Sequence, residues 1–218
     1  MLYLFTKQDS LSPLSAIPGL EVKENDDPLL MSILGQISLD EARNRLLNDH
    51  KAYVAYLDHI PVAFGWLALG KAKIGELDHE FIVPFNQAYL WNFRTLESFR
   101  GRGIYPHLLQ GIIALEQSKT SCFWIMHAPE NRASQRGILK AGFNFIGEVS
   151  VLANQVVFQS QNPAISSSFI MDIFGFNQSE ESQASCWNCS SPYLSKRKME
   201  CCCSLNEQVC SQNLFALV

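Results

Sequence analysis

A glycine- and arginine-rich turn is the stretch of this sequence best suited to bind an anion. It reads Arg100, Gly101, Arg102, Gly103 and Ile104. Glycines let consecutive backbone N–H groups point into one concavity. The start of a helix adds unpaired N–H donors and partial positive charge. These features predict a pyrophosphate site with two arginines at its rim; the alternative is a tight strand-to-helix turn with solvated arginines.

Two familiar phosphate-binding patterns do not match this turn. The sequence has no Gly-x-x-x-x-Gly-Lys-Ser/Thr, which excludes a nucleoside-triphosphate P-loop. The turn also lacks the third glycine and the acidic residue after the next strand that a dinucleotide-binding fold requires.

Apolar periodicity places the turn between a strand and a helix. Residues 88–96 are rich in aromatic side chains and predict a strand that ends at Thr95 and Leu96, and a period of 3.6 from Ile104 predicts a helix to about Lys119. We interpret residues 10–31 and 70–87 as variable loops. Further strands are expected at 2–6, 53–57, 62–69, 81–83, 122–126, 143–151 and 155–159, and helices at 38–49 and 131–141. This order predicts an α/β domain with a mixed sheet.

A second motif follows one strand after the first. Asn131-x-x-Ser134 begins the next predicted helix, and Ala141-Gly142-Phe143 closes it. Together with Arg100-x-x-Gly103, in this order, the motifs resemble the GNAT superfamily of acyl-CoA-dependent N-acetyltransferases over about residues 1–160. The resemblance implies a mixed, mostly antiparallel sheet of about six to seven strands, flanked by helices and splayed at the strand before the turn.

The resemblance also implies how acetyl-CoA would bind. The strand-end backbone would pair with the pantetheine arm, the turn would hold the pyrophosphate, and the second motif would lie beside the distal arm. The implied set is Thr95, Leu96, Arg100, Gly101, Arg102, Gly103, Ile104, Tyr105, Asn131 and Ser134. The implied reaction is direct acetyl transfer to an unidentified amine, in which a strand-end amide stabilises the oxyanion and no covalent enzyme intermediate forms.

Two positions depart from the family pattern. Tyr105 stands where the turn usually carries a third small residue, and Ile138 stands where many members place a tyrosine that protonates the departing CoA thiolate. The acidic and histidine residues at 76–80 are candidates for a general base, but no catalytic residue is assigned. The alternative function is therefore a weak or inactive acyl-CoA-binding module whose tail engages a partner.

The composition changes near residue 160, where a Ser-, Asn- and Cys-rich segment begins. We therefore expect an acetyltransferase-like domain at 1–160 and an extension at 161–218. Six of the seven cysteines lie in the extension, and Cys186, Cys189, Cys203 and Cys210 could enclose a tetrahedral zinc ion. A flexible thiol-bearing tail and an iron–sulfur cluster are the alternatives. Cys122 lies in an apolar strand and is interpreted as a packed core thiol.

Composition excludes several other classes of function. The chain has 218 residues with a net charge of −4, so it carries no basic field for nucleic acid. Its 47% hydrophobic and 17% charged residues suit a packed core, and no apolar run is long enough to span a membrane. We recognise no signal peptide. We therefore expect a cytoplasmic protein with neither a nucleic-acid nor a membrane partner; its oligomeric state is not defined by the sequence.

Overall fold

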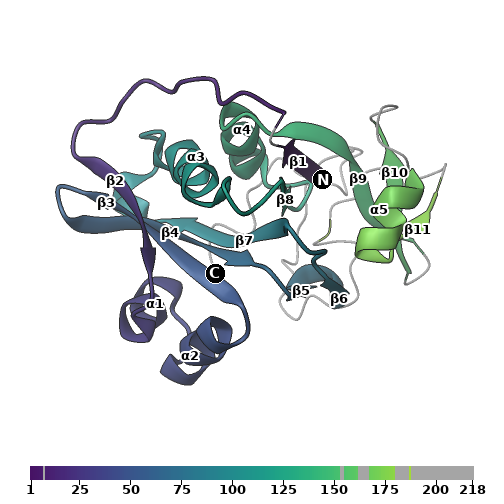
Figure 1. Ribbon diagram of the computed structural model, residues 1–218, viewed down its shortest axis with the longest axis horizontal. Coiled ribbons are helices and arrows are strands. Elements are labelled where there is room, and N and C mark those ends of the chain that lie inside the picture. Colours follow the sequence, from purple (N-terminus) through teal and green to yellow (C-terminus); the bar gives the residue numbers. More distant parts are fainter. Residues whose placement is uncertain (7, 153–154, 162–166, 180–186, 188–218) are drawn as a thin grey trace.

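A nine-stranded sheet forms the centre of the computed structural model, which describes residues 1–6, 8–152, 155–161, 167–179 and 187 (Figure 1). The strand order is β11-β10-β9-β1-β8-β7-β4-β3-β2, with parallel pairing only between β7 and β8 and between β10 and β11. The strands are β1 (Leu2–Thr6), β2 (Leu20–Asn25), β3 (His50–Leu57), β4 (Ile60–Ala68), β7 (Gln87–Thr95), β8 (Cys122–Met126), β9 (Asn144–Leu152), β10 (Gln155–Ser160) and β11 (Asn177–Gln178). A separate hairpin contains β5 (Lys71–Ile74) and β6 (His79–Ile82).

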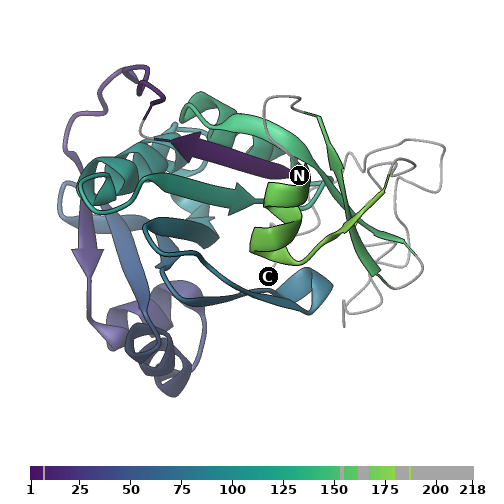
Figure 2. The same ribbon diagram turned by 45° about the vertical axis from the view of Figure 1, so that its right-hand side comes forward.

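Helices cover both faces of this sheet. They are α1 (Pro28–Gly35), α2 (Leu39–Leu47), α3 (Ile104–Glu116), α4 (Arg132–Lys140) and α5 (Ser167–Phe174), with 3₁₀ turns η1 (Gly75–Leu77) and η2 (Glu97–Phe99). On one face α3 and α4 lie side by side and share one apolar cluster with the central strands (Figure 1). On the other face, α1 and α2 cover β3 and β4, whereas α5 and the hairpin cover the half that contains β9 and β10 (Figure 2).

The predicted mixed α/β class is confirmed, but the predicted number of strands is too small. The sheet has nine strands rather than six or seven, because β2 and β11 extend its two edges. Residues 10–31 are not only a loop, since they contain β2 and the beginning of α1. The start of α1 has ordinary local signals: the Asp27 side chain accepts a hydrogen bond from the Leu29 N–H at 2.8 Å, and Pro28 stands in the first turn. Residues 70–87 likewise contain β5, η1 and β6.

The sheet opens between β7 and β8, which confirms the expected splay. Parallel pairing of these strands covers only Gln87–Leu90 of β7. The same strand stays paired with β4 as far as Thr95, with a register shift at which Asn92 adopts a left-handed φ of 50°. A one-residue bulge of this kind bends a strand and increases its twist. The backbone from Trp91 to Thr95 therefore runs beside β4 without a β8 partner.

The chain continues to add to the domain after residue 160. Strand β11 pairs with β10, and Phe174 of α5 and Trp187 are buried in the cluster beneath β9 and β10. The Trp187 indole donates to the Val149 carbonyl at 2.9 Å. The division of the chain at residue 160 stays a prediction. Among the described helices, none is long and apolar enough to cross a membrane.

Candidate cofactor-binding site

Helix α3 begins in a loop whose backbone N–H groups from Gly101 onward have no acceptor in the part of the chain that the structure describes. Gly101 and Gly103 both have a φ of 77°, a left-handed conformation that glycine adopts without strain. Before them, the Arg100 N–H is donated to the Glu97 carbonyl at 3.2 Å. Within the described residues, no carbonyl or side chain accepts the backbone N–H groups of residues 101–105. Five donors thus remain available at the positive end of a helix dipole, the arrangement that binds anions.

The loop is open on its outer side and carries positive charge. A Cβ on Gly101 would meet no atom within 4 Å, and a Cβ on Gly103 would meet only Lys140 Nζ, at 4.0 Å. Lys140 comes from the last turn of α4 and places an ammonium group beside the loop. Arg100 Nε donates to the Thr95 carbonyl at 3.2 Å, and the Arg102 guanidinium lies 5.3 Å from the centre of the Phe99 ring. The site therefore combines free N–H donors with three cations.

Tyr105 joins the start of α3 to the start of α4. Its hydroxyl lies 3.3 Å from Ser134 Oγ, and its ring lies against Gly137 so closely that a Cβ on Gly137 would collide with it. Asn131 Oδ1 accepts the Ser134 N–H at 2.9 Å and so caps α4. Within the described residues, the Asn131 side-chain NH₂ has no hydrogen-bond acceptor. The two motifs of the sequence are thus brought together at one end of the sheet.

The exposed edge of β7 lies beside these helix starts. The Leu96 N–H is donated to the Val62 carbonyl of β4 at 2.9 Å. Because successive residues of a strand direct their backbone groups to opposite sides, Thr95 and Phe93 direct theirs to the open side, away from β4. The Phe93 ring lies directly over Gly65, where a Cβ would collide with it, and its centre is 5.5 Å from that of Tyr105. A ligand along this edge would meet the backbone of Thr95, whereas the Leu96 N–H is already bonded.

Tyr105 and Ile138 are the two residues of this site that depart from the expected pattern. Burial is the main cause that raises the pKa of Tyr105 above its usual value near 10, so the phenol is protonated at neutral pH. Ile138 is fully buried in the cluster between α3, α4 and the sheet. It has no polar atom and no exposure with which to reach a departing thiolate. Tyr105 therefore keeps its phenol proton at the start of α3, with its hydroxyl beside Ser134.

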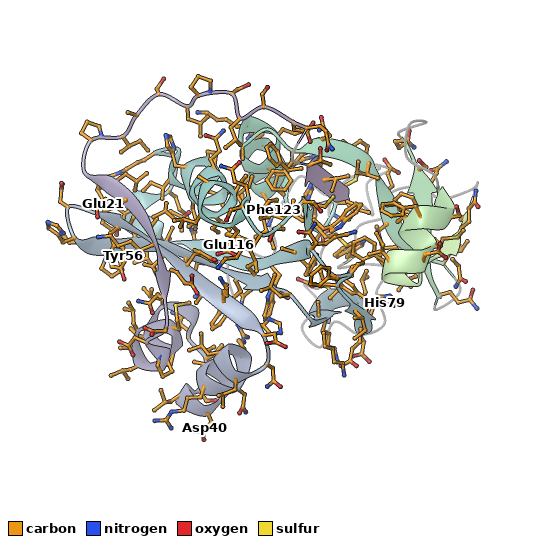
Figure 3. The ribbon with its side chains drawn as sticks, in the orientation of Figure 1. Glu21, Asp40, Tyr56, His79, Glu116 and Phe123 are labelled. Carbon is orange, nitrogen blue, oxygen red and sulfur yellow. The ribbon has the colours of Figure 1, made fainter. Side chains whose placement is uncertain are left out.

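The candidate bases at 76–80 belong to the hairpin rather than to the loop. Asp78 and Glu80 form ion pairs with Lys73 and Lys71 at 2.5 and 2.6 Å. His79 Nε2 contacts the Phe174 carbonyl of α5. Glu76 is half-buried, and burial is the main cause that raises its pKa. Figure 3 shows His79 at the hairpin, beside α5.

Sequence reasoning missed two contributors to the site. Phe93 belongs to the bulged part of β7, and the signal that could have identified it was a glycine, Gly65, in the interior of the neighbouring strand. Lys140 reaches the loop only through the packing of α4 on α3, which no local pattern indicates. The proposed zinc ligands Cys186, Cys189, Cys203 and Cys210 lie outside the described residues. Among the described residues, no cluster of three or more His, Cys, Asp or Glu side chains could hold a metal ion.

The fold and site define an α/β protein with a splayed mixed sheet and a helix that starts at a glycine loop with unbonded N–H donors among the described residues. No family model matches the sequence, and no curated protein matches it either. A GCN5-related N-acetyltransferase from Kribbella flavida is similar at 15% identity over 57% of this chain and 46% of that chain, with a TM-score of 0.40. The present chain thus spans less than half the length of that protein.

Two further solved structures show the same likeness of fold. One is the ribosomal-protein-S5-alanine acetyltransferase from Vibrio fischeri, at 12% identity over 63% of this chain and 85% of that chain, with a TM-score of 0.47. The other is a ribosomal L7/L12 alpha-N-protein acetyltransferase in complex with coenzyme A, at 17% identity over 65% and 85%, with a TM-score of 0.44. The proteins that this chain resembles in fold include acetyltransferases.

Proposed function

We propose that the protein binds acetyl-CoA and transfers its acetyl group to an amine in the cytoplasm. The observation that supports this most strongly is the row of five N–H donors from Gly101 to Tyr105 at the start of α3, which have no acceptor among the described residues. A diphosphate is an anion of the size and charge that such a row can hold. The open edge of β7 and the free NH₂ of Asn131 add donors and acceptors for an amide-containing arm.

In the proposed complex, the diphosphate lies against the loop between Gly101 and Tyr105, with Lys140 and Arg102 nearby. The pantetheine amides run along the Thr95 edge of β7, and the Asn131 NH₂ donates to one of their carbonyls. The Thr95 carbonyl keeps one lone pair beyond the bond from Arg100 Nε. This path places the thioester between the Phe93 end of β7 and the Tyr105 hydroxyl.

The reaction needs no group bound covalently to the protein. The neutral amine attacks the thioester carbonyl, a C–N bond forms and the C–S bond breaks, the amine loses one proton and the sulfur gains one. Holding the two reactants in line lowers much of the entropic part of the barrier. Tyr105 is the proposed hydrogen-bond donor to the departing sulfur, because burial keeps its proton in place and Ser134 orients its hydroxyl.

Tyr105→Phe is expected to lower kcat by about tenfold to a hundredfold, the loss of one hydrogen bond to a charged leaving group. The ring would keep its contacts with Gly137 and Phe93, so the Kd of acetyl-CoA should change by less than about threefold. Steady-state kinetics and calorimetry on the same preparation check both values. An unchanged kcat would remove Tyr105 from the reaction and leave acetyl-CoA binding intact.

A second candidate function is acyl-CoA binding without efficient transfer. The observation that favours it is Ile138, which is fully buried and carries no proton donor. In this alternative the thioester serves as a signal rather than as a substrate. Most of the proposed partner-binding tail, residues 180–186 and 188–218, lies outside the described residues.

Calorimetry with acetyl-CoA and with S-acetylpantetheine tests the binding proposal. The second ligand lacks the diphosphate, so we expect its affinity to be lower by at least about 150-fold, equivalent to two charge-assisted hydrogen bonds of about 1.5 kcal/mol each. Equal affinities, or no binding of acetyl-CoA, would contradict the site. Release of free thiol with a panel of amines then separates the enzyme from the binding module, since tight binding without turnover favours the module.

A further inference from the structure

Strand β2 ends the nine-stranded sheet, and part of its outer edge is unpaired within the described residues (Figure 2). The Asp58 N–H is donated to the Gly19 carbonyl at 3.0 Å, and the register continues from Leu20 opposite Leu57 to Asn25 opposite Ala52. Because strand residues alternate in direction, Glu21 and Lys23 bond toward β3, whereas Val22 and Glu24 direct their N–H and C=O groups outward. The Leu20 N–H donates to the Ile17 carbonyl at 3.1 Å, so it is not available to a partner strand.

The order of the charged residues along β2 determines which strand can pair with its outer edge. Glu21 and Lys23 are both exposed, flank Val22 and form an ion pair with each other at 2.5 Å. An antiparallel copy of this edge would offer each of the two charges a second partner of opposite sign. Exposed charges often protect an edge strand from pairing. A like-charged edge repels a second copy of itself, but a Glu-Val-Lys edge is complementary to its own antiparallel copy.

We infer that β2 pairs antiparallel with β2 of a second copy of this chain, about a two-fold axis at Val22. In this register Glu21 faces the partner's Lys23, and the same contact is repeated by symmetry. The two Val22 residues exchange a pair of backbone hydrogen bonds, and each Glu24 N–H donates to the carbonyl of the partner's Leu20. Only outward-directed groups are used, so no bond between β2 and β3 is lost.

The same charges disfavour the neighbouring registers. A two-fold axis at Glu21 would place two carboxylates opposite each other, and an axis at Lys23 would place two ammonium groups opposite each other. Like charges directly across a strand pair are destabilising. The sequence thus selects one register by attraction in it and by repulsion in the alternatives.

An apolar strip beside the edge adds to this surface. Helix α3 approaches β2 so closely that a Cβ on Gly111 would lie 2.7 Å from Val22 Cβ. Ala114 and Leu115 follow Gly111 by three and four residues, so they lie on the same side of the helix. Both are exposed, Leu115 by 49%. A two-fold axis through the edge puts both copies of α3, with these exposed side chains, on one face of the joined sheet.

Charge reversal tests the pairing. By light scattering coupled to size-exclusion chromatography, from about 1 to about 200 µM, we expect the wild-type protein to reach the mass of two chains. Glu21→Lys and Lys23→Glu each create two like-charged contacts and should weaken the dimer by at least about tenfold. The double variant Glu21→Lys/Lys23→Glu should recover it, and so should a mixture of the two single variants, which pair as a heterodimer.

Val22→Pro is a second, independent variant. It removes an outward N–H without removing a bond to β3, so the monomer should keep its circular dichroism spectrum while the dimer is lost. A wild-type protein that stays monomeric over the whole concentration range would overturn the inference. So would a dimer that is unaffected by the single charge reversals. Neither result bears on acetyl-CoA binding, which the calorimetry measures separately.

Discussion

Gly101→Val is expected to weaken acetyl-CoA binding by about a hundredfold, or about 3 kcal/mol, because it misdirects two or more of the loop N–H donors. Gly101 has a φ of 77°, and a β-branched residue is a genuine outlier in that region. A Cβ placed there meets no atom of the described residues within 4 Å, so a collision of the Cβ is not the cause. The expected damage is a shift of the backbone itself.

Gly175→Val is the matched control for this experiment. Gly175 has a similar φ of 68°, and its substituent would meet only His79, at the ordinary contact distance of 4.0 Å. Both variants should lose about 1–2 kcal/mol of stability from the left-handed conformation, measured by urea unfolding. Only Gly101→Val should lose affinity in calorimetry. An equal loss of acetyl-CoA affinity in both variants would show that the loop N–H groups do not hold the ligand.

The loop could be predicted from the sequence because its determinants are local. Two glycines in a left-handed conformation, a helix period from Ile104 and an asparagine cap at Asn131 each act within a few residues. Strand β2 and helix α1 had local signals too: alternating polarity from Leu20 to Asn25 and an Asp27–Pro28 helix start. The turn-rich residues 10–18 directly before them obscure these signals in the sequence.

The remaining parts of the site depend on register and packing. The bulge at Asn92 exists because β4 and β7 are out of step by one residue, a relation between strands that are far apart in the sequence. Lys140 reaches Gly103 only because α4 packs beside α3. Contacts of this kind can be predicted only once the register of the strands and the packing of the helices are known.

The two departures from the family pattern are connected in space. Tyr105 replaces a small residue, and its ring occupies the volume that a side chain at Gly137 would need. The next residue, Ile138, turns into the core and fills it. The Tyr105 phenol thus enters this end of the sheet from α3, with its hydroxyl beside Ser134. Sequence alone shows the two residue types but not this packing.

A buried histidine is expected to make this fold sensitive to acid. His127 is 6% exposed, its Nδ1 lies 2.7 Å from the Ala128 carbonyl, and its Nε2 lies 3.2 Å from the Tyr3 hydroxyl. Nδ1–H donates and Nε2 accepts, which defines the neutral ring. Burial is the main cause that lowers its pKa to about 3.

The unfolded chain protonates His127 near pH 6.5, whereas the folded protein does not until about pH 3. Stability from the neutral ring is therefore present above pH 6.5 and is lost as the pH falls toward 3. The loss is about 2 kcal/mol by pH 5 and about 4 kcal/mol by pH 3. Urea unfolding at pH 7, 6 and 5 measures the free energy directly.

His127→Asn should remove this pH dependence while keeping a nitrogen donor at the Nδ1 position. We expect the variant to be less stable than the wild type at pH 7, because the bond to Tyr3 is lost, and the difference to shrink by about 2 kcal/mol at pH 5. His59→Asn is the control, since His59 is exposed in the turn between β3 and β4. A difference between wild type and His127→Asn that stays constant from pH 7 to pH 5 would show that the buried ring accepts a proton as readily as it does in water.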